Sequence, residues 1–267
     1  MEDLCDILFE LSNEDRLSII KLLNRGSLNL TDISKRLDLT TQESSRHLSR
    51  LGDVGIIVKG ADGLFTLTNY GELVLKQMEG LEFSSKYKSY FSSHTMSHIP
   101  EEFVARVGEL SNSYLVDNVM TSFYKVEKLI EEADEYILEM TDRYIMSTFP
   151  VLRDAYKREV KLSNIQRIDF ISHPMYSDID PEVAEELKHL SPRLWEERYL
   201  DKLPFFLYMS EKEVAVIGFP VDGKLDYIGF SSEDKKVHRW CHDLFQHFWK
   251  KAKITSEKTR DMHPFKV

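Results

Sequence analysis

Apolar positions recur at helical spacing near the start of the chain. Leu17, Ile20 and Leu23 form a stripe that repeats every three or four residues, with Asn13 before it and Gly26 after it. Asparagine is a common N-cap, and glycine is common just beyond a helix end. The pattern therefore predicts an amphipathic helix between Asn13 and Gly26.

A second, shorter helix is predicted over residues 31–37, and a three-residue connection leads from it to a third helix. Thr40 and Glu43 have the spacing of a capping box, in which each side chain satisfies a free backbone amide of the first turn. Leu48 and Leu51 fall on one side of this third helix. The opposite side is slim, polar and cationic, and it carries Gln42, Ser45, Arg46 and Ser49, with Arg50 at its border.

Two β-prone runs follow the third helix, at residues 56–58 and 64–68, around a Gly-Ala-Asp-Gly turn. A helix-turn-helix followed directly by a β-hairpin is a winged helix, so we expect the third helix to enter the major groove of DNA. In that position Gln42 pairs with an adenine edge, and Arg46 with guanine or a phosphate. Further phosphate contacts are expected from Lys35, Arg50 and Lys59.

The distribution of charge along the chain favours nucleic-acid binding by one local segment rather than by the whole protein surface. The 267 residues carry a formal net charge of −10, which argues against non-specific DNA binding by the whole surface. Residues 21–59 are nevertheless net positive, with seven Lys and Arg against four Asp and Glu. The positive charge thus falls on the predicted DNA-binding segment.

The composition also bears on where in the cell the protein is expected to be found. No apolar run approaches the roughly 18 residues that span a bilayer, and the first twelve residues are acidic where a secretory signal is basic. The only cysteines, Cys5 and Cys241, are too few and too far apart to indicate a disulfide framework. We expect a cytoplasmic protein without membrane contact.

Residues 15–57, DRLSIIKLLNRGSLNLTDISKRLDLTTQESSRHLSRLGDVGII, followed by a wing and LTNYG, resemble archaeal and bacterial repressors of the arsenical-resistance type. The resemblance implies a winged helix-turn-helix domain, which we place at residues 1–70. Metal sensors of that type use cysteine and histidine ligands near their helices. This segment offers only Cys5 and His47, so a metal response is not expected.

Residues 70–93 show an interrupted helical stripe that Gly80 weakens without breaking. We interpret residues 71–95 as a linker helix that forms the seam of a homodimer or the hinge to the next domain, and a dimer would suit a palindromic operator. The alternative is a helix that packs only on its own chain.

The remaining residues, 96–267, alternate first between helices and strands and then between strands and short turns, which predicts an α/β domain with a mixed sheet. Helices are expected from Pro100, over 121–133 and over 151–160, with strands at 136–140 and 165–171. Four further strands are expected within 193–200, 205–210, 213–219 and 226–230, and a final helix over 236–253 is expected to cover the sheet.

Four stretches of this half resemble the sensor domain of the archaeal methanogenesis-regulator (filamentation-regulator) family: IPEEFVARVGELSNSYLV, EEADEYILEMTD, LPFFLYMSEKEVAVIGFPVDGKLDYIGF and WCHDLFQHFWKKAK. The resemblance implies an α+β protein: a ligand-responsive archaeal transcription factor whose sensor is similar to half of a phospholipase D-like fold. One departure is KREVKLSNIQR, residues 157–167, a polar connection where the family usually has a glycine-containing turn into the second strand.

Candidate ligand-binding residues follow from the position of strand ends, because open α/β sheets bind ligands beyond the carboxyl ends of parallel strands. Asp142 could instead cap a helix or pair with an arginine. The candidates are Thr141, Asp142, Arg143, His173, Tyr199 and Ser231.

Catalytic and cofactor chemistry find little support in the sequence. No histidine has lysine two positions later, as phospholipase D-type catalysis requires, and no phosphate-binding glycine loop occurs. The pairs His238/His242 and His94/His98 have metal-ligand spacing but are more typical of surface or interface positions. We predict no metal, no cofactor and no enzymatic activity.

The sequence therefore predicts a DNA-binding transcriptional regulator whose C-terminal domain senses a small-molecule effector or a partner. Two alternatives stay open. One is a phosphodiesterase-like enzyme with an adaptor winged helix, and the other is a winged-helix module that binds protein.

Overall fold

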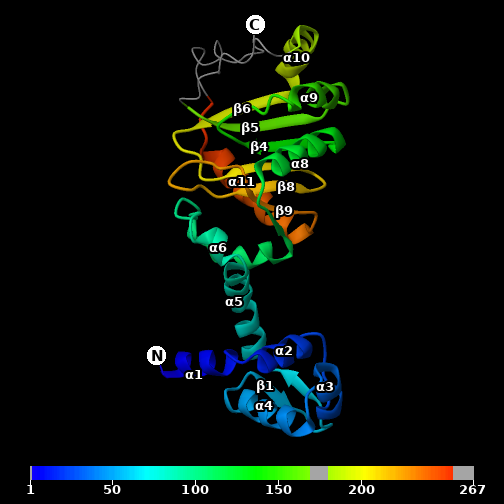
Figure 1. Ribbon diagram of the computed structural model, residues 1–267, viewed down its shortest axis with the longest axis vertical. Coiled ribbons are helices and arrows are strands. Elements are labelled where there is room, and N and C mark those ends of the chain that lie inside the picture. Colours follow the sequence, from blue (N-terminus) through cyan, green and yellow to red (C-terminus); the bar gives the residue numbers. More distant parts are fainter. Residues whose placement is uncertain (1, 169–179, 255–267) are drawn as a thin grey trace. The chain divides into compact units, whose positions relative to one another are not determined.

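The computed structural model describes residues 2–168 and 180–254 (Figure 1). The chain divides into two compact units, Met1–Leu81 and Glu82–Val267. The helix α5 (Asn69–Lys86) begins in the first unit and ends in the second.

The first unit is a helix-turn-helix with a two-stranded wing, as predicted. Strands β1 and β2 are antiparallel, with Ile57 opposite Leu67, and Leu28 bridges to Phe65 beside them. The elements are α1 (Glu2–Leu11), α2 (Glu14–Leu23), α3 (Leu30–Leu37), α4 (Thr41–Asp53), β1 (Ile57–Lys59), β2 (Phe65–Leu67) and the first part of α5. Only α1 was not expected from the sequence.

A small apolar core holds these helices together. Ile19 of α2, Ile33 of α3 and Leu51 of α4 are fully buried against one another and against Ile56. Burial of such side chains is the main favourable contribution to folding. The helical stripes read from the sequence are therefore the faces that form this core.

The second unit is built on a seven-stranded mixed sheet with the order β3-β9-β8-β7-β4-β5-β6. Strands β4, β5 and β6 are parallel, and the other neighbours are antiparallel. The strands are β3 (Tyr114–Val116), β4 (Tyr136–Met140), β5 (Lys161–Arg167), β6 (Trp195–Leu200), β7 (Phe206–Ser210), β8 (Val214–Gly218) and β9 (Gly229–Ser232). The predicted mixed sheet is confirmed.

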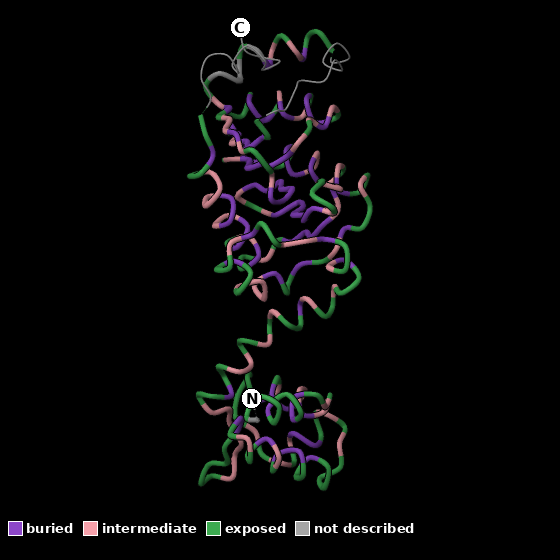
Figure 2. The backbone as a smooth tube through the Cα atoms, turned by 90° about the vertical axis from the view of Figure 1, so that its left-hand side faces the viewer, coloured by how far each residue is buried: buried purple, intermediate pink, exposed green. Residues whose placement is uncertain are grey.

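Helices cover both faces of this sheet (Figure 1). On one face, α8 and α9 pack through Val126, Leu129 and Phe149. On the other, α11 packs through Trp240 and Leu244, which confirms the expected covering helix. The helices are α6 (Lys88–Phe91), α7 (Glu101–Val104), the 3-10 helix η1 (Val107–Asn112), α8 (Val119–Glu132), α9 (Thr148–Lys157), α10 (Pro181–Leu194) and α11 (Lys235–Lys251). Figure 2 shows the buried residues gathered in the middle of this unit, and strands β7, β8 and β9 are buried along their whole length.

Two sequence expectations for this unit were wrong in detail. The helix from Pro100 is only the short α7 followed by η1, and β3 follows where no strand was expected. The second strand begins at Lys161, four residues before the predicted start, so the polar connection in residues 157–167 is largely the strand itself. The reason is that the start of β5 contains polar residues such as Asn164, which is buried although its polarity suggested a connection.

Within the described residues, no helix combines the length and the apolar character needed to cross a membrane.

Candidate functional sites

Helix α4 is held in place at its start by the predicted capping box. The Thr40 hydroxyl accepts a hydrogen bond from the Glu43 amide at 3.2 Å, and the Glu43 carboxylate accepts one from the Thr40 amide at 3.0 Å. Hydrogen bonds to the Glu43 carboxylate from the Thr40 hydroxyl, and then from the Thr40 amide, lower the pKa of Glu43 from its ordinary value. The first turn of α4 is thus fixed by residues adjacent in sequence.

The turn before α4, and the packing of α4 on α3, also depend on residues that are close together in the sequence. Asp38 ends α3 in the left-handed conformation, with φ of 54°, which an aspartate tolerates better than most residues. The Ser34 hydroxyl donates to the Ser44 hydroxyl at 2.9 Å where the two helices meet. Both serines are buried, and their small side chains allow the helices to approach closely.

The opposite face of α4 is open to solvent, as the sequence indicated. Leu48 and Leu51 are buried on the inner side. The four side chains predicted to contact bases are all exposed and form one row: Gln42, Ser45, Arg46 and Ser49. This row can approach a groove floor because the two serines keep it slim.

Arg50 lies at the border of that row, and its guanidinium is held within the protein. Its Nε and an Nη atom donate to the two carboxylate oxygens of Glu10 on α1, at 2.8 and 2.6 Å. The hydrogen bond from Arg50 lowers the pKa of Glu10, and the same bond raises the pKa of Arg50. Sequence reasoning missed this role, because α1 itself was not predicted.

The remaining two predicted phosphate contacts lie on other elements of the first unit. Lys35 is exposed on α3, and Lys59 is exposed at the end of β1, where its ammonium lies 5.5 Å from the centre of the Phe65 ring. Both ammonium groups can therefore contact the DNA backbone from outside the α4 row.

In the second unit, three of the predicted ligand residues lie together where β4 ends. Thr141 is buried, and its hydroxyl donates to the Arg143 carbonyl at 2.8 Å. The Asp142 carboxylate accepts a hydrogen bond from the Tyr227 hydroxyl, and the Arg143 guanidinium lies 4.4 Å from the centre of the Tyr227 ring. Burial, and then the bond to Asp142, raise the pKa of Tyr227.

A cavity of about 300 Å³ opens beside Asp142. Pockets for small molecules have volumes of roughly 300–1,000 Å³, so this one is at the small end of the range. Its charged and ionisable lining residues are His98, Asp142, Arg167, Asp201, Lys202 and Lys224. Arg167 and Lys202 were missed, although each lies at or shortly after the end of a strand, which is the signal that identified Asp142. Lys224 was also missed, and it lies within the connection between β8 and β9.

The other three predicted ligand residues do not join this group. The prediction for Ser231 was wrong. Strand β9 runs antiparallel to β4, so Ser231 lies at the opposite end of the strands from Asp142, where its hydroxyl donates to the Val214 carbonyl. Tyr199 lies towards the carboxyl end of β6, the same end of the sheet as Asp142, but it is buried, and its hydroxyl donates to the Glu197 carboxylate. His173 lies outside the described residues.

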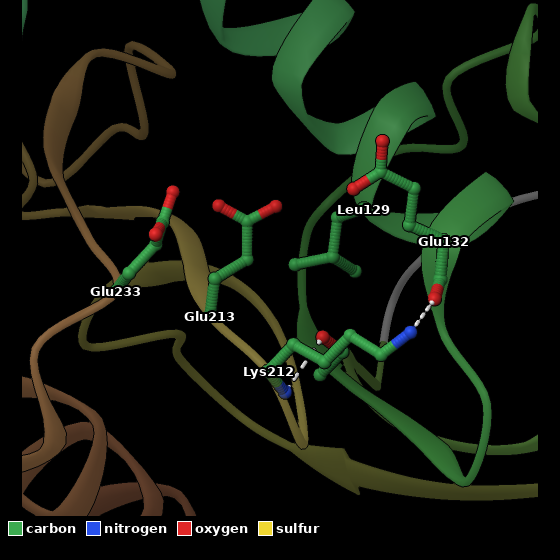
Figure 3. A pocket seen from close by; sticks show the side chains of 6 residues that line it. Leu129, Glu132, Lys212, Glu213 and Glu233 are labelled. Carbon is green, nitrogen blue, oxygen red and sulfur yellow. Dashed lines mark hydrogen bonds between the residues drawn. The ribbon is translucent and has the colours of Figure 1, made fainter.

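A second pocket lies at the edge near Ser231 and is acidic (Figure 3). Its lining includes Glu132, Glu213 and Glu233, with the carboxylates of the last two beside one another. Burial, opposed in part by Lys125, raises the pKa of Glu213. Lys212 beside them is already engaged, since its ammonium donates to the Glu132 carbonyl and pairs with Asp134 at 2.7 Å.

Histidines with metal-ligand spacing are engaged in other contacts. The Nε2 atom of His238 lies 2.7 Å from the Ser210 carbonyl oxygen, and that of His94 lies 2.7 Å from the Asp226 carboxylate. Among the residues that the structure describes, no group of three or more His, Cys, Asp or Glu side chains could hold a metal ion.

Comparison with known families identifies the first unit. Residues 13–59 match the family model described as bacterial regulatory protein, arsR family. The chain contains a helix-turn-helix domain of the arsR type. The match runs from the N-cap of α2 to the end of β1 and therefore includes the whole exposed row on α4.

Comparison with solved structures gives distant similarities. TrmBL2, whose description is an archaeal chromatin protein with a novel mode of DNA binding, matches 91% of this chain and 94% of its own at 16% identity and a TM-score of 0.41. The S-adenosylmethionine-dependent methyltransferase SibL matches 72% of this chain and 61% of its own, at 13% identity and a TM-score of 0.27. An O-methyltransferase family protein from Burkholderia thailandensis matches 72% and 63%, at 11% identity and a TM-score of 0.26.

These TM-scores are too low to carry an argument about function, and these structures give no support to the predicted phospholipase D-like half-fold. A comparison with curated proteins found no match.

Proposed function

We propose that this chain is a sequence-specific transcriptional regulator that reads operator DNA with α4. The observation that carries the proposal is the exposed row of Gln42, Ser45, Arg46 and Ser49 on a capped helix whose other face is buried. The arsR-type match over the same residues supports it. In a helix-turn-helix, the second helix of the motif enters the major groove and presents such side chains to base edges.

The proposed DNA contacts are of two kinds, contacts to bases and contacts to phosphates. Gln42 is suited to a bidentate contact with adenine, and Arg46 to one with guanine. Lys35, Lys59 and Arg50 contribute phosphate contacts, which fix the register of the protein on the duplex without reading sequence. For Arg50, the contact uses donors beyond the two that Glu10 accepts.

The regulator binds DNA as a homodimer, in this proposal. On α5, Tyr70, Leu73 and Leu81 fall on one face of the helix, and all three are exposed. Gln77 lies between Leu73 and Leu81 on this face, and exposed apolar side chains gathered on one face of a helix are typical of a protein interface. On α1, the exposed side chains of Leu4, Leu8 and Phe9 offer a second apolar surface.

The second unit serves as a cytoplasmic ligand sensor rather than as an enzyme, in keeping with the resemblance to the methanogenesis-regulator family. The pocket beside Asp142 is its candidate effector site. Ligand binding changes DNA affinity only if the ligand prefers one of two arrangements of the dimer, and the coupling is typically about 1–3 kcal/mol.

Selection of genomic DNA fragments with the purified full-length protein tests the proposal. We expect enrichment of a sequence with two half-sites, and loss of that enrichment in the Arg46→Ala variant. Binding of all fragments alike, or no salt-dependent binding to duplex DNA, would contradict a role in operator recognition. Hydrolysis of a generic phosphodiester substrate that Asp142→Asn abolishes would instead indicate an enzyme.

A further inference from the structure

A row of polar side chains crosses the interior of the second unit on the sheet face that α8 and α9 cover. Tyr208 on β7 pairs with Glu139 on β4, Glu139 pairs with Asn164 on β5, and Asn164 pairs with Glu197 on β6. Directly opposed residues on neighbouring strands point to the same face. The four side chains therefore form one line across four strands.

A second line lies one step closer to the carboxyl edge on the same face. Gln166 on β5 pairs with Tyr199 on β6. Residues two apart on a strand share a face, so Gln166 is beside Asn164, and Tyr199 is beside Glu197. We call Tyr208, Glu139, Asn164, Glu197, Gln166 and Tyr199 the polar row.

The two amides of this row have no hydrogen-bond partner in the structure. Asn164 and Gln166 are both 0% exposed, and neither the amide nitrogen nor the amide oxygen of either side chain is bonded. The hydroxyl of Tyr156 on α9 is likewise buried without a partner. Folded proteins satisfy the large majority of buried polar atoms, so such a concentration requires an explanation.

The Tyr156 ring also lies on this face of the sheet, in the same buried cluster as Tyr208. Burial, followed by the nearby carboxylates of Glu139 and Glu197, raises the pKa of Tyr156. Leu162 of β5 is buried in this cluster as well, so α9 adds an unbonded hydroxyl on the sheet face that carries the unbonded amides.

The rest of the polar row determines the charge of a suitable ligand. Burial raises the pKa of Glu139 to about 8, so this carboxyl group is protonated and uncharged at neutral pH. The hydroxyls of Tyr144 and Tyr199 donate to the two carboxylate oxygens of Glu197 at 3.2 and 2.5 Å. The atoms left unbonded are amide and phenol groups, which are neutral and include both donors and acceptors.

We propose that the polar row binds a small uncharged molecule that carries both hydrogen-bond donors and acceptors, with Asn164 and Gln166 as its principal contacts. The ligand bonds both ends of each amide and accepts from or donates to Tyr156. Its chemistry is that of a polyol, a sugar, a nucleoside or a neutral amide. Anions are disfavoured, because the Glu197 carboxylate would repel them.

Gln166 lies nearer than Asn164 to the carboxyl ends of the parallel strands, the end of the sheet at which the cavity beside Asp142 lies. This proposal deepens the sensing role proposed above and rests on it only for the consequence of binding, since occupancy of the row does not require DNA.

The first experiment asks whether the amides serve a ligand or the fold, and it needs no knowledge of the ligand. Asn164→Leu and Gln166→Met replace each amide with an apolar side chain of similar shape. Such replacements remove the cost of burying unbonded groups. We expect both full-length variants to unfold at the wild-type temperature or above. A fall of more than about 5 °C in both would show that the amides hold the fold together, and would overturn the proposal.

The second experiment measures binding by isothermal titration calorimetry of the full-length protein with D-glucose, myo-inositol, uridine and nicotinamide. Inorganic phosphate and spermidine are the charged controls. We expect at least one neutral probe to bind once per chain, with affinity reduced at least about tenfold by Asn164→Leu and by Gln166→Met. Glu213→Gln, in the acidic pocket at the opposite edge, is the matched control and should leave that affinity unchanged.

Three results would each reject the proposal: no neutral probe binds, a charged control binds more tightly than every neutral probe and loses that binding in both amide variants, or the bound neutral probe is insensitive to both amide variants. Operator binding by the same protein without any probe is measured separately. The polar row can therefore fail as a ligand site while the DNA-binding proposal stands, and the reverse outcome is equally visible.

Discussion

Arg50 on α4 and Glu10 on α1 are joined by two hydrogen bonds, at 2.8 and 2.6 Å. The Glu10 carboxylate also lies 3.2 Å from the Arg16 guanidinium on α2. This carboxylate therefore connects α4, the predicted reading helix, to α1 and α2. Paired, planar contacts between an arginine and a carboxylate are geometrically specific, so the pair fixes the orientation of Arg50 beside the α4 row.

Replacing Glu10 with glutamine should lower the unfolding temperature of the first unit and do so in a pH-dependent way. The pKa of Glu10 is lowered in the folded protein, chiefly by its bond from Arg50. The stabilisation is thus present above the ordinary pKa of 4.5 and is lost as the pH falls through the lowered folded value. Thermal unfolding of wild type and Glu10→Gln between pH 3 and pH 7 measures this, and curves that differ equally at all pH values would contradict it.

Replacing Arg46 with alanine should reduce operator discrimination. A bidentate contact with guanine contributes about 1–3 kcal/mol of discrimination, whereas a phosphate contact contributes alike on all sequences. Fluorescence anisotropy on operator and random duplex distinguishes the two cases. Lys59→Ala is the comparison variant: it should weaken binding to both duplexes equally and lower the salt slope by about 1. Equal losses on both duplexes for Arg46→Ala would show that Arg46 contacts only phosphate.

Removing the cap of α4 should destabilise the first unit without removing any predicted DNA contact. Thr40→Ala eliminates the hydroxyl that accepts from the Glu43 amide, and loss of such a cap costs about 1 kcal/mol. Urea unfolding measures the change in free energy. Thr41→Ala, at the exposed next position, is the control and should be nearly neutral, since that hydroxyl caps nothing.

The stability of the second unit should fall as the pH rises from about 5 to about 8, because of Glu139. Its folded pKa is raised to about 8 from an ordinary 4.5, so the folded state holds a proton that the unfolded state releases across this range. Glu139→Gln should flatten the slope of unfolding free energy against pH. An unchanged slope in that variant would mean that Glu139 is ionised in the folded protein.

Introducing charge on the α5 stripe should separate the proposed dimer. Leu73 is 55% exposed, and Leu73→Glu places a carboxylate within the apolar face that the proposed interface buries. Sedimentation velocity should show dimer for wild type and monomer for the variant. Lys76→Ala, off the stripe on the same helix, should leave the mass unchanged. A monomeric wild type would exclude the interface.

The sequence predicted the first unit well because its determinants are local. Capping of α4 depends on two residues three positions apart, and the inner face of α4 depends on the spacing of Leu48 and Leu51. The exposed row followed from the same spacing. The pairing of Arg50 with Glu10 could not be predicted in this way, since the two residues are forty positions apart and only folding brings them together.

In the second unit, the sequence determined the type of most elements, because alternating apolar runs identify strands irrespective of their partners. Tertiary structure decided strand order and direction, and with them the site. Ser231 was assigned to the wrong edge because the direction of β9 depends on which strands it pairs with. Asn164 was placed before the strand and the burial of Gln166 was not anticipated, because polarity in a sequence signals exposure; only the packed sheet shows that both amides are buried.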